Sequence, residues 1–152
     1  EKQNFAVNVC FDDVSITEIK GIAISTNNGI LNSKPIAGKT AILNNVYFNT
    51  DAFELLSEST KELDELISWM KMYPKVTVQI SGHTDNTGTE KHNDELSSNR
   101  AKAVVEYLIK NGIETERLQH KGYAARFALA DNNSEAGRKL NRRVEFTIVK
   151  ID

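Results

Sequence analysis

The sequence predicts an α/β sandwich of the α+β class, in which one mixed sheet packs its apolar face on two main helices. Apolar and polar residues alternate in residues 76–80 and 144–148, as in strands with one buried face. Apolar residues instead recur with the helical period in residues 63–70 and 96–108. These patterns follow one another along the chain and predict the order β-α-β-α-β-β from residue 41 onward.

Residues 1–40 differ from the rest of the chain, because they are rich in β-branched residues, Asn, Gly and Ser. Residues 5–9 and 22–25 have the composition of short strands, and the Asn-Asn-Gly of residues 27–29 predicts a hairpin turn. Residues 34–39 predict a connector. A segment of this length is too short for a stable domain of its own. We therefore expect a β-rich extension that packs on the rest, or the tail of a preceding domain.

The main domain, residues 41–152, begins with a strand, a helix and a second strand. Residues 42–48 have the composition of a strand, and Ser59-Thr60-Lys61-Glu62 matches a capping box, which predicts the start of a helix. Pro74 predicts the end of that helix. The second strand leads into Gly82, a residue that permits close approach of another backbone.

The second half of the domain supplies the other helix and two more strands. Apolar residues between 96 and 108 share one face of the helix, and Asn111-Gly112 predicts its C-terminal cap. Residues 118–123 predict a third strand and residues 144–148 the last one. Residues 124–141 predict a longer polar connection between these two strands.

The composition is that of an ordinary globular domain and excludes several functions. The chain has 152 residues, of which 39% are hydrophobic and 26% charged. A net charge of −2 and a pI near 6.0 give no electrostatic footprint for nucleic acid. No run of eighteen apolar residues exists, so we expect no membrane insertion by this chain. Cys10 is the only cysteine, which excludes an internal disulfide, and we expect it to be a small buried hydrophobe.

Two opposite charges mark a candidate site at the carboxyl end of the second strand. Asp85 follows that strand directly, and Arg100 lies in the first turns of the second helix. A strand-loop-helix turn can bring both to one rim, where they suit a ligand that carries an ammonium and a carboxylate. Two alternatives stay open at this point: the two side chains pair with each other, or Asp85 caps its own loop.

Other polar residues near this rim have two interpretations each. Asn93 is predicted either to cap the second helix or to present its amide to a ligand. Arg142 and Arg143 are adjacent at the start of the last strand, so their side chains face opposite ways. One of them can therefore reach the ligand rim while the other lies along the opposite face.

Catalytic and metal sites are not indicated by the sequence. The spacing of His83, Asp85 and His92 matches no zinc signature, and no G-x-S-x-G motif is present. Acidic residues between 90 and 95 fit a loop and a first helical turn, where they favour the helix dipole. We therefore expect neither an enzyme nor a bound cofactor or metal.

Taken together, the motifs resemble the OmpA-like peptidoglycan-binding domain, which is shared by outer membrane protein A, the peptidoglycan-associated lipoproteins and the flagellar stator proteins. The resemblance covers about residues 41–152. The matching segments are residues 46–50, 82–88, 93–101, 112–113, 117–118, 122–123, 131–132 and 137–145.

The resemblance implies a non-catalytic domain that binds the peptide stem of peptidoglycan through meso-diaminopimelate. It implies an anchor between the cell wall and an attached outer-membrane or periplasmic domain, at the periplasmic face of a Gram-negative outer membrane. By position, Asp85 would take the ligand's ammonium and Arg100 its carboxylate. The other residues implied to line the pocket are Thr84, Asn93, Arg142, Phe48, Asn49 and Thr50.

Some positions depart from the family pattern. The family often has Asp where this chain has Asn49, and a tyrosine or similar residue where it has His92. It commonly has Gly and Pro where this chain has Ala124 and Ala128. The change at Asn49 and the unassigned residues 1–40 leave an alternative open, in which the chain is a structural or protein-interaction module with a vestigial pocket.

Overall fold

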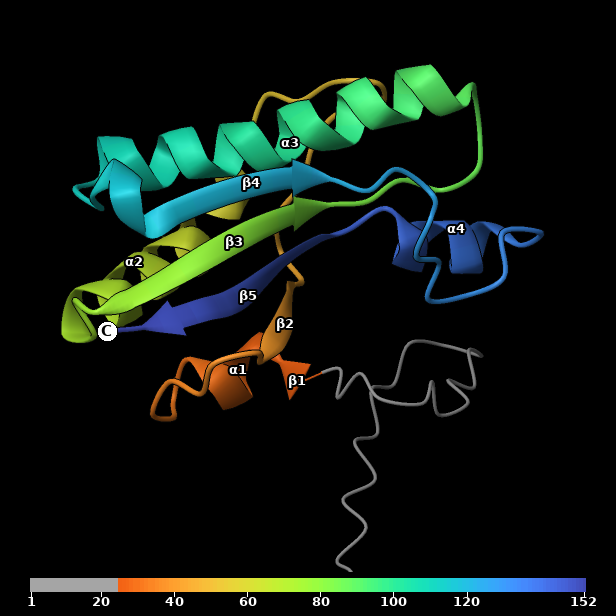
Figure 1. The fold of residues 1–152 in the computed structure, drawn as a ribbon. Helices are drawn as coiled ribbons and strands as arrows, with labels where there is room; N and C mark the ends of the chain where they lie inside the picture. The colour runs from red at the N-terminus through yellow and green to blue at the C-terminus, as the bar shows by residue number, and fades with distance from the viewer. Residues whose placement is uncertain (1–24) are drawn as a thin grey trace, which may run out of the picture.

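The computed structural model describes residues 25–152, which form a five-stranded mixed sheet in the order β1-β2-β5-β3-β4 (Figure 1). The strands are β1 Ser25–Thr26, β2 Thr40–Leu43, β3 Val76–Gly82, β4 Leu118–Gly122 and β5 Val144–Ile151. The helices are α1 Asn27–Ile30, α2 Thr60–Met72, α3 Glu90–Lys110 and α4 Glu135–Asn141, with short 3-10 helices at Ser57–Ser59 and Thr115–Arg117. From β2 onward this is the predicted order, with α4 inserted before the last strand.

The sheet is mixed, as predicted. Strands β1 and β2 are parallel, as are β3 and β4, whereas β5 runs antiparallel to both of its neighbours, β2 and β3. Alternate residues of β3 and β5 are buried and join the apolar faces of α2 and α3 in one core. The prediction of one mixed sheet packed on two main helices is confirmed. None of the helices in residues 25–152 is both long and apolar enough to cross a membrane.

The predicted hairpin at residues 27–29 is wrong, because these residues belong to α1. The reason is the pairing of the strands: β1 and β2 are parallel, and parallel neighbours need a crossover instead of a tight turn. Residues 27–39 make this crossover and pack on the domain. Ile30 is buried in the core, and the carbonyl of Ser33 accepts a hydrogen bond of 3.2 Å from Trp69 Nε1. The strand predicted at residues 5–9, most of that at 22–25, and Cys10 lie outside the described residues.

The first predicted strand is shorter than expected and ends at Leu43. The backbone N–H groups of Asn44 and Asn45 donate to the carboxylate of Glu62, and Tyr47 N donates to Ser59 Oγ over 2.8 Å. The capping box is therefore wrong in detail, since Ser59 is the N-cap residue of α2 but its side chain makes no capping hydrogen bond. The side chains of Ser59 and Glu62 instead hold a loop over residues 44–56, which leads back to the helix.

The C-terminal ends of the two main helices follow the predicted signals, whereas the N-terminal ends differ from them in detail. Helix α2 ends at Met72, just before Pro74, and Asn111 with Gly112 caps α3. The N-cap of α3 is Thr89, whose side chain accepts a hydrogen bond of 3.2 Å from His92 N. Asn93 is thus not the N-cap and lies one turn inside the helix.

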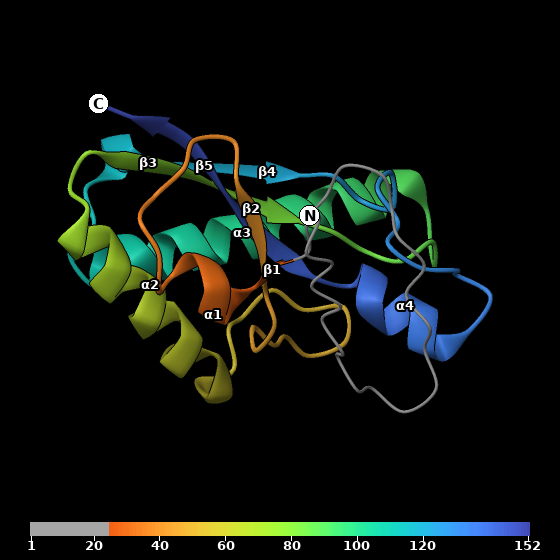
Figure 2. The ribbon, with the colours of Figure 1, turned by 90° about the horizontal axis from the view of Figure 1, so that it is seen from below.

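Helix α4 was not predicted within the polar connection of residues 124–141. It has only seven residues, and Ser134 caps it by accepting a hydrogen bond of 3.0 Å from Gly137 N. Gly137 is required because a Cβ there would lie 1.8 Å from the carbonyl oxygen of Asp131. Figures 1 and 2 both place α4 beside the loop that joins β3 to α3.

Helix α3 lies against the ends of β3 and β4 at two glycines that are partners in the sheet, Gly82 and Gly122. A Cβ at Gly82 would lie 2.1 Å from the carbonyl oxygen of Ser97, and a Cβ at Gly122 would lie 2.5 Å from Ser97 Oγ. Both distances are far below van der Waals contact, so only glycine allows the helix to approach this closely. The approach fixes the first turns of α3 over the end of β3.

We expect Gly82→Ala to lower the free energy of unfolding by about 3 kcal/mol, because the helix must move away from the sheet. Gly38→Ala is a suitable control, since Gly38 has a φ of +81° but nothing within 4 Å of an added Cβ. It should lower the free energy by only about 1–2 kcal/mol, the strain of the left-handed backbone. Urea unfolding of the two variants measures both, and a smaller loss for Gly82→Ala than for Gly38→Ala would contradict the close approach.

Candidate functional site

Asp85 lies in the loop after β3 and is only 6% exposed. Its Oδ2 accepts a hydrogen bond of 2.6 Å from Arg142 Nη1. Its Oδ1 accepts one of 2.8 Å from the backbone N–H of Thr87, a local turn typical of aspartate. Asp85 therefore does cap its own loop, but its ion-pair partner is Arg142, which the sequence analysis had not paired with it.

The pKa of Asp85 is set by two opposing effects. Burial alone would raise the pKa of its carboxyl, but the hydrogen bonds from Arg142 and Thr87 outweigh burial and hold the pKa below its ordinary value. Asp85 is therefore ionised at neutral pH and offers an anionic position at this rim.

Arg100 projects from α3 and is 8% exposed. Its Nε donates to the carbonyl oxygen of Ala52 over 2.9 Å and its Nη2 to that of Asn49 over 3.4 Å. The guanidinium carbon lies 5.1 Å from the centre of the Phe48 ring, within the range of a cation–π contact. Within residues 25–152 no carboxylate forms an ion pair with Arg100.

Arg100 is nevertheless close enough to the other charges of the site to feel them. Burial and the nearby Arg142 lower the pKa of Arg100, while Asp51 and Asp85 partly offset this. Guanidinium groups remain protonated in proteins, so Arg100 is a buried cation held by carbonyl dipoles and an aromatic ring. It offers a cationic position on the same rim as Asp85.

The two adjacent arginines lie just before β5, and Arg142 is the C-cap of α4, so the prediction that they begin the last strand is wrong. Their side chains nevertheless have different partners. Arg142 pairs with Asp85 and, through Nη2, with Glu135 Oε1 at 2.6 Å. Arg143 is buried, and its Nε pairs with Glu145 Oε1 at 2.6 Å. Arg142 is thus the one that reaches the site.

Asn93 and Thr84 complete the inner wall of the site. Asn93 Nδ2 donates to the carbonyl oxygens of Thr87, at 3.0 Å, and Asp85, at 3.4 Å, so this amide fixes the loop that carries Asp85. The Thr84 N–H donates to Ala124 O over 3.0 Å. Its hydroxyl is buried and has no hydrogen-bond partner among the described residues.

The turn of residues 49–52 forms the outer rim. Asn49 and Thr50 are exposed, and Ala52 N donates to Asn49 O over 3.1 Å. His92 Nε2 lies 2.6 Å from Asp51 Oδ1, which joins this turn to the start of α3. Asp51 has a positive φ of 57° and was not predicted as a member of the site. Its pairing with His92 joins residues 41 positions apart, so no local pattern could reveal it.

His83, considered for a metal site from its spacing, faces the opposite side of the sheet. It is buried and stacks on Tyr123 with the ring centres 5.4 Å apart. Burial lowers the pKa of His83, with a smaller opposing effect from Glu145. In residues 25–152 no cluster of three His, Cys, Asp or Glu side chains could hold a metal ion.

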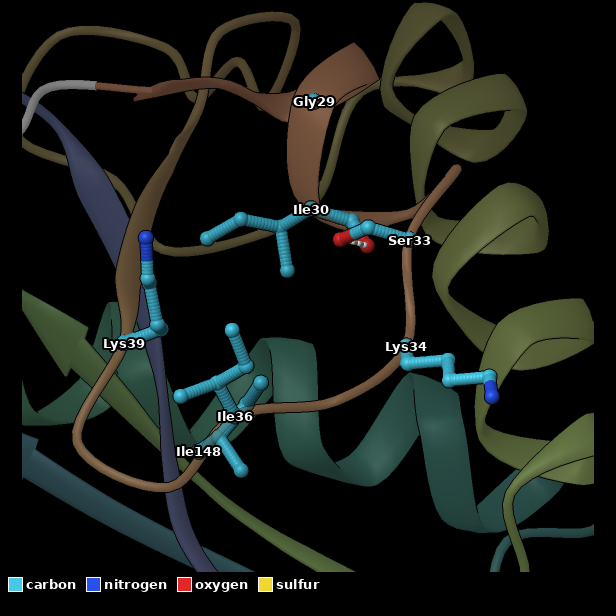
Figure 3. Close-up of a pocket in the computed structure, with 7 residues that line it drawn as sticks. All are labelled: Gly29, Ile30, Ser33, Lys34, Ile36, Lys39 and Ile148. Carbon is cyan, nitrogen blue, oxygen red and sulfur yellow. Dashed lines mark hydrogen bonds between the residues drawn. The ribbon is translucent and has the colours of Figure 1, made fainter.

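The structure also has a small hollow of about 80 Å³ between the connector and β5 (Figure 3). Ile30, Ile36 and Ile148 project toward its centre, whereas Lys34 points away from it. The lining combines three isoleucines with two lysines, a serine and a glycine; it holds no acidic residue, and none of the charged residues of the rim belongs to it. This hollow therefore offers no charge pair for a ligand.

The residues of the candidate site lie in a part of the sequence that matches a known protein family. A family model described as the OmpA family matches residues 47–142. The chain belongs to the OmpA family. Every residue of the rim, from Phe48 to Arg142, falls within the matched range.

This OmpA-family chain is similar in sequence to two curated bacterial proteins and in fold to a solved structure. It is 35% identical to outer membrane porin F of Pseudomonas fluorescens over 114 residues, 75% of this chain and 35% of the porin. It is 34% identical to the peptidoglycan-binding protein ArfA of Mycobacterium bovis over 103 residues, 68% of this chain and 32% of ArfA. The crystal structure of the peptidoglycan-associated lipoprotein from Burkholderia pseudomallei matches with a TM-score of 0.63 and 26% identity, covering 67% of this chain and 86% of that one.

The OmpA-family chain spans about a third of the length of the first curated relatives it matches. The predicted OmpA-like fold is confirmed by these similarities. The two opposite charges that the sequence predicted for the site are near each other, because the charge of Asp85 raises the pKa of Arg100. The contact that sequence reasoning missed is the ion pair between Asp85 and Arg142, whose partners are 57 positions apart.

Asp85 should make the stability of this OmpA-family domain depend on pH in the acid range. Its folded pKa is depressed, so its contribution is complete above the unfolded pKa near 4 and is lost as pH falls through the lower folded value. We expect Asp85→Asn to lower the free energy of unfolding by about 1–2 kcal/mol at pH 7 and by much less at about pH 2–3. Urea unfolding at both pH values measures the difference.

Glu106→Gln is the control for this experiment, because within residues 25–152 the ion pair of Glu106 is an exposed one with Lys102 on α3. It should change the free energy of unfolding by no more than about 0.5 kcal/mol at neutral pH. A loss for Asp85→Asn that is the same at both pH values would contradict the ionised, hydrogen-bonded Asp85.

Proposed function

We propose that this domain binds peptidoglycan non-covalently through its peptide stem, and so anchors an attached outer-membrane or periplasmic domain to the cell wall. The observation that carries this proposal is a buried guanidinium, Arg100, which has no carboxylate partner among the described residues. It shares a rim with the ionised Asp85. The family, and relatives named as peptidoglycan-binding and peptidoglycan-associated, support the same function.

The ligand chemistry follows from the two charges. The side-chain end of meso-diaminopimelate carries both an ammonium and a carboxylate. Arg100 would bind the carboxylate with its guanidinium, and Asp85 would accept hydrogen bonds from the ammonium. The remaining wall of the proposed pocket consists of Thr84, Asn93, Arg142, Phe48, Asn49 and Thr50.

Much of the site is held in place before a ligand arrives. The carbonyls of Asn49 and Ala52 and the Phe48 ring fix the guanidinium of Arg100. A group that is already ordered loses little conformational entropy on binding, so more of each contact remains as affinity. Each charge-assisted contact then contributes about 1.5–3 kcal/mol. This is equilibrium binding with no chemical step, and we assign no catalytic residue.

One observation favours a different function, a protein-interaction module with a vestigial pocket. Asp85 is already paired with Arg142, so its carboxylate has a partner without any ligand. In a vestigial site this pair would be permanent and peptidoglycan would not bind. Binding of the wild-type domain to purified sacculi separates the two functions.

We expect Asp85→Ala and Arg100→Lys each to weaken binding of meso-diaminopimelate by about tenfold or more, as measured by calorimetry. Lysine keeps the charge of Arg100 but loses its two-pronged geometry and its hydrogen bonds to Ala52 and Asn49. Both variants should also lose retention on purified sacculi.

Arg126→Ala is the matched control, because Arg126 is an exposed arginine that pairs with Asp94 and Glu90 on α3. It should bind like the wild type. If Asp85→Ala and Arg100→Lys bind meso-diaminopimelate as tightly as this control does, the assignment of these two residues to the site is wrong. If the wild type itself is not retained on sacculi, the proposed function is wrong and the interaction module is favoured.

A further inference from the structure

The anionic and cationic positions of the proposed pocket differ in one respect. The carboxylate of Asp85 already binds a guanidinium, that of Arg142, at 2.6 Å. Among the described residues, Arg100 donates only to carbonyl oxygens and lies against an aromatic ring. A ligand carboxylate can therefore bind Arg100 without breaking an ion pair. A ligand ammonium can bind Asp85 only if it replaces Arg142.

Arg142 is well suited to leave Asp85. Its side chain is 36% exposed, and its Nη2 also binds Glu135 Oε1 at 2.6 Å. Glu135 lies in the first turn of α4 and is mainly exposed, so the pair that it makes with Arg142 is at the surface. Arg142 can give up Asp85 and still keep a carboxylate partner.

The two guanidiniums lie close enough for like-charge repulsion. Arg142 lowers the pKa of Arg100, whereas Asp85 raises it, so both act on the same buried cation. An anion bound at Arg100 would relieve this repulsion and would attract Arg142 as well. The carboxylate of a ligand therefore weakens the hold of Asp85 on Arg142.

We propose that Arg142 is the selectivity residue of the pocket: its guanidinium occupies the place of the ligand ammonium, and the ligand enters by exchange of partners. The ligand carboxylate binds Arg100 and draws Arg142 away, while the ligand ammonium replaces Arg142 at Asp85. One internal ion pair is broken and two pairs with the ligand are formed. This inference rests on the proposed function and names how its site selects ligands.

The exchange makes the two ligand charges act together. A ligand end with an ammonium alone must displace Arg142 from Asp85 without offering it another anion. A ligand end with a carboxylate alone offers Asp85 no cation in exchange for Arg142, so only one pair with the ligand forms. The pocket therefore selects a stem peptide that ends in diaminopimelate over one that ends in lysine, beyond the direct contact with Arg100.

Two synthetic stem tripeptides test this selectivity: L-Ala-γ-D-Glu-meso-diaminopimelate and L-Ala-γ-D-Glu-L-lysine. They differ only in the carboxylate at the side-chain end. In Arg142→Gln the lysine peptide no longer has to displace a guanidinium, so we expect it to bind about tenfold more tightly than it binds the wild type. The diaminopimelate peptide should change much less, and the ratio of the two dissociation constants should fall accordingly.

Arg138→Gln is the matched control, because Arg138 also pairs with Glu135, at 2.9 Å, but not with Asp85. Like Arg142→Gln, it removes a positive charge that pairs with Glu135. It should leave the ratio of the two dissociation constants unchanged. Melting temperatures of the two variants show that both are folded, which is expected because both side chains lie at the surface.

The outcomes separate the inference from the function on which it rests. If the wild type binds the diaminopimelate peptide but Arg142→Gln binds the lysine peptide no more tightly than the wild type does, the exchange is wrong and the proposed function stands. An equal loss for both peptides in Arg142→Gln would make Arg142 a simple ligand contact and would also overturn the exchange. If the wild type binds neither peptide, the function and the inference fall together.

Discussion

The close approach of α3 to the sheet determines the geometry of the whole site. Gly82 and Gly122 leave room for Ser97, whose hydroxyl accepts a hydrogen bond from Ala124 N over 3.0 Å. The carbonyl of Ala124, which has a positive φ of 48°, in turn accepts from Thr84 N. Three segments that are far apart in the sequence are therefore fixed together at the carboxyl end of β3. Asp85 and Arg100 share a rim because both begin from this junction.

The loop of residues 44–56 is also held by side chains of the neighbouring helical segments. Glu62 and Ser59 bind its first backbone N–H groups, and Arg100 binds two carbonyl oxygens at its tip. Buried backbone groups must find hydrogen-bond partners, and here charged and hydroxyl side chains from two helices provide them. The loop in turn supplies the carbonyl dipoles and the aromatic ring that make a buried guanidinium tolerable. Loop and arginine therefore stabilise each other.

Long elements were predictable and short, tertiary ones were not. Helices α2 and α3 and strands β3 and β5 each bury one face, and this leaves a periodic pattern in the sequence. The seven-residue α4, the end of β2 at Leu43 and the crossover at α1 depend on contacts with distant residues, which no local pattern records. The same division holds for the site. The strand end and helix start predicted the shared rim of Asp85 and Arg100, but the partner of Asp85 comes from the unpredicted end of α4.

The burial of Arg100 determines how this rim responds to ionic strength. Mobile ions screen charges at a surface within about 10 Å in 0.1 M salt, but they screen a buried cation much less. At 8% exposure, Arg100 lies largely beyond the reach of dissolved salt. Attraction between this guanidinium and the bound carboxylate of the proposed ligand would therefore persist in media of widely different salinity. The exposed pairs of Arg126 with Asp94 and Glu90 would weaken over the same range of salt.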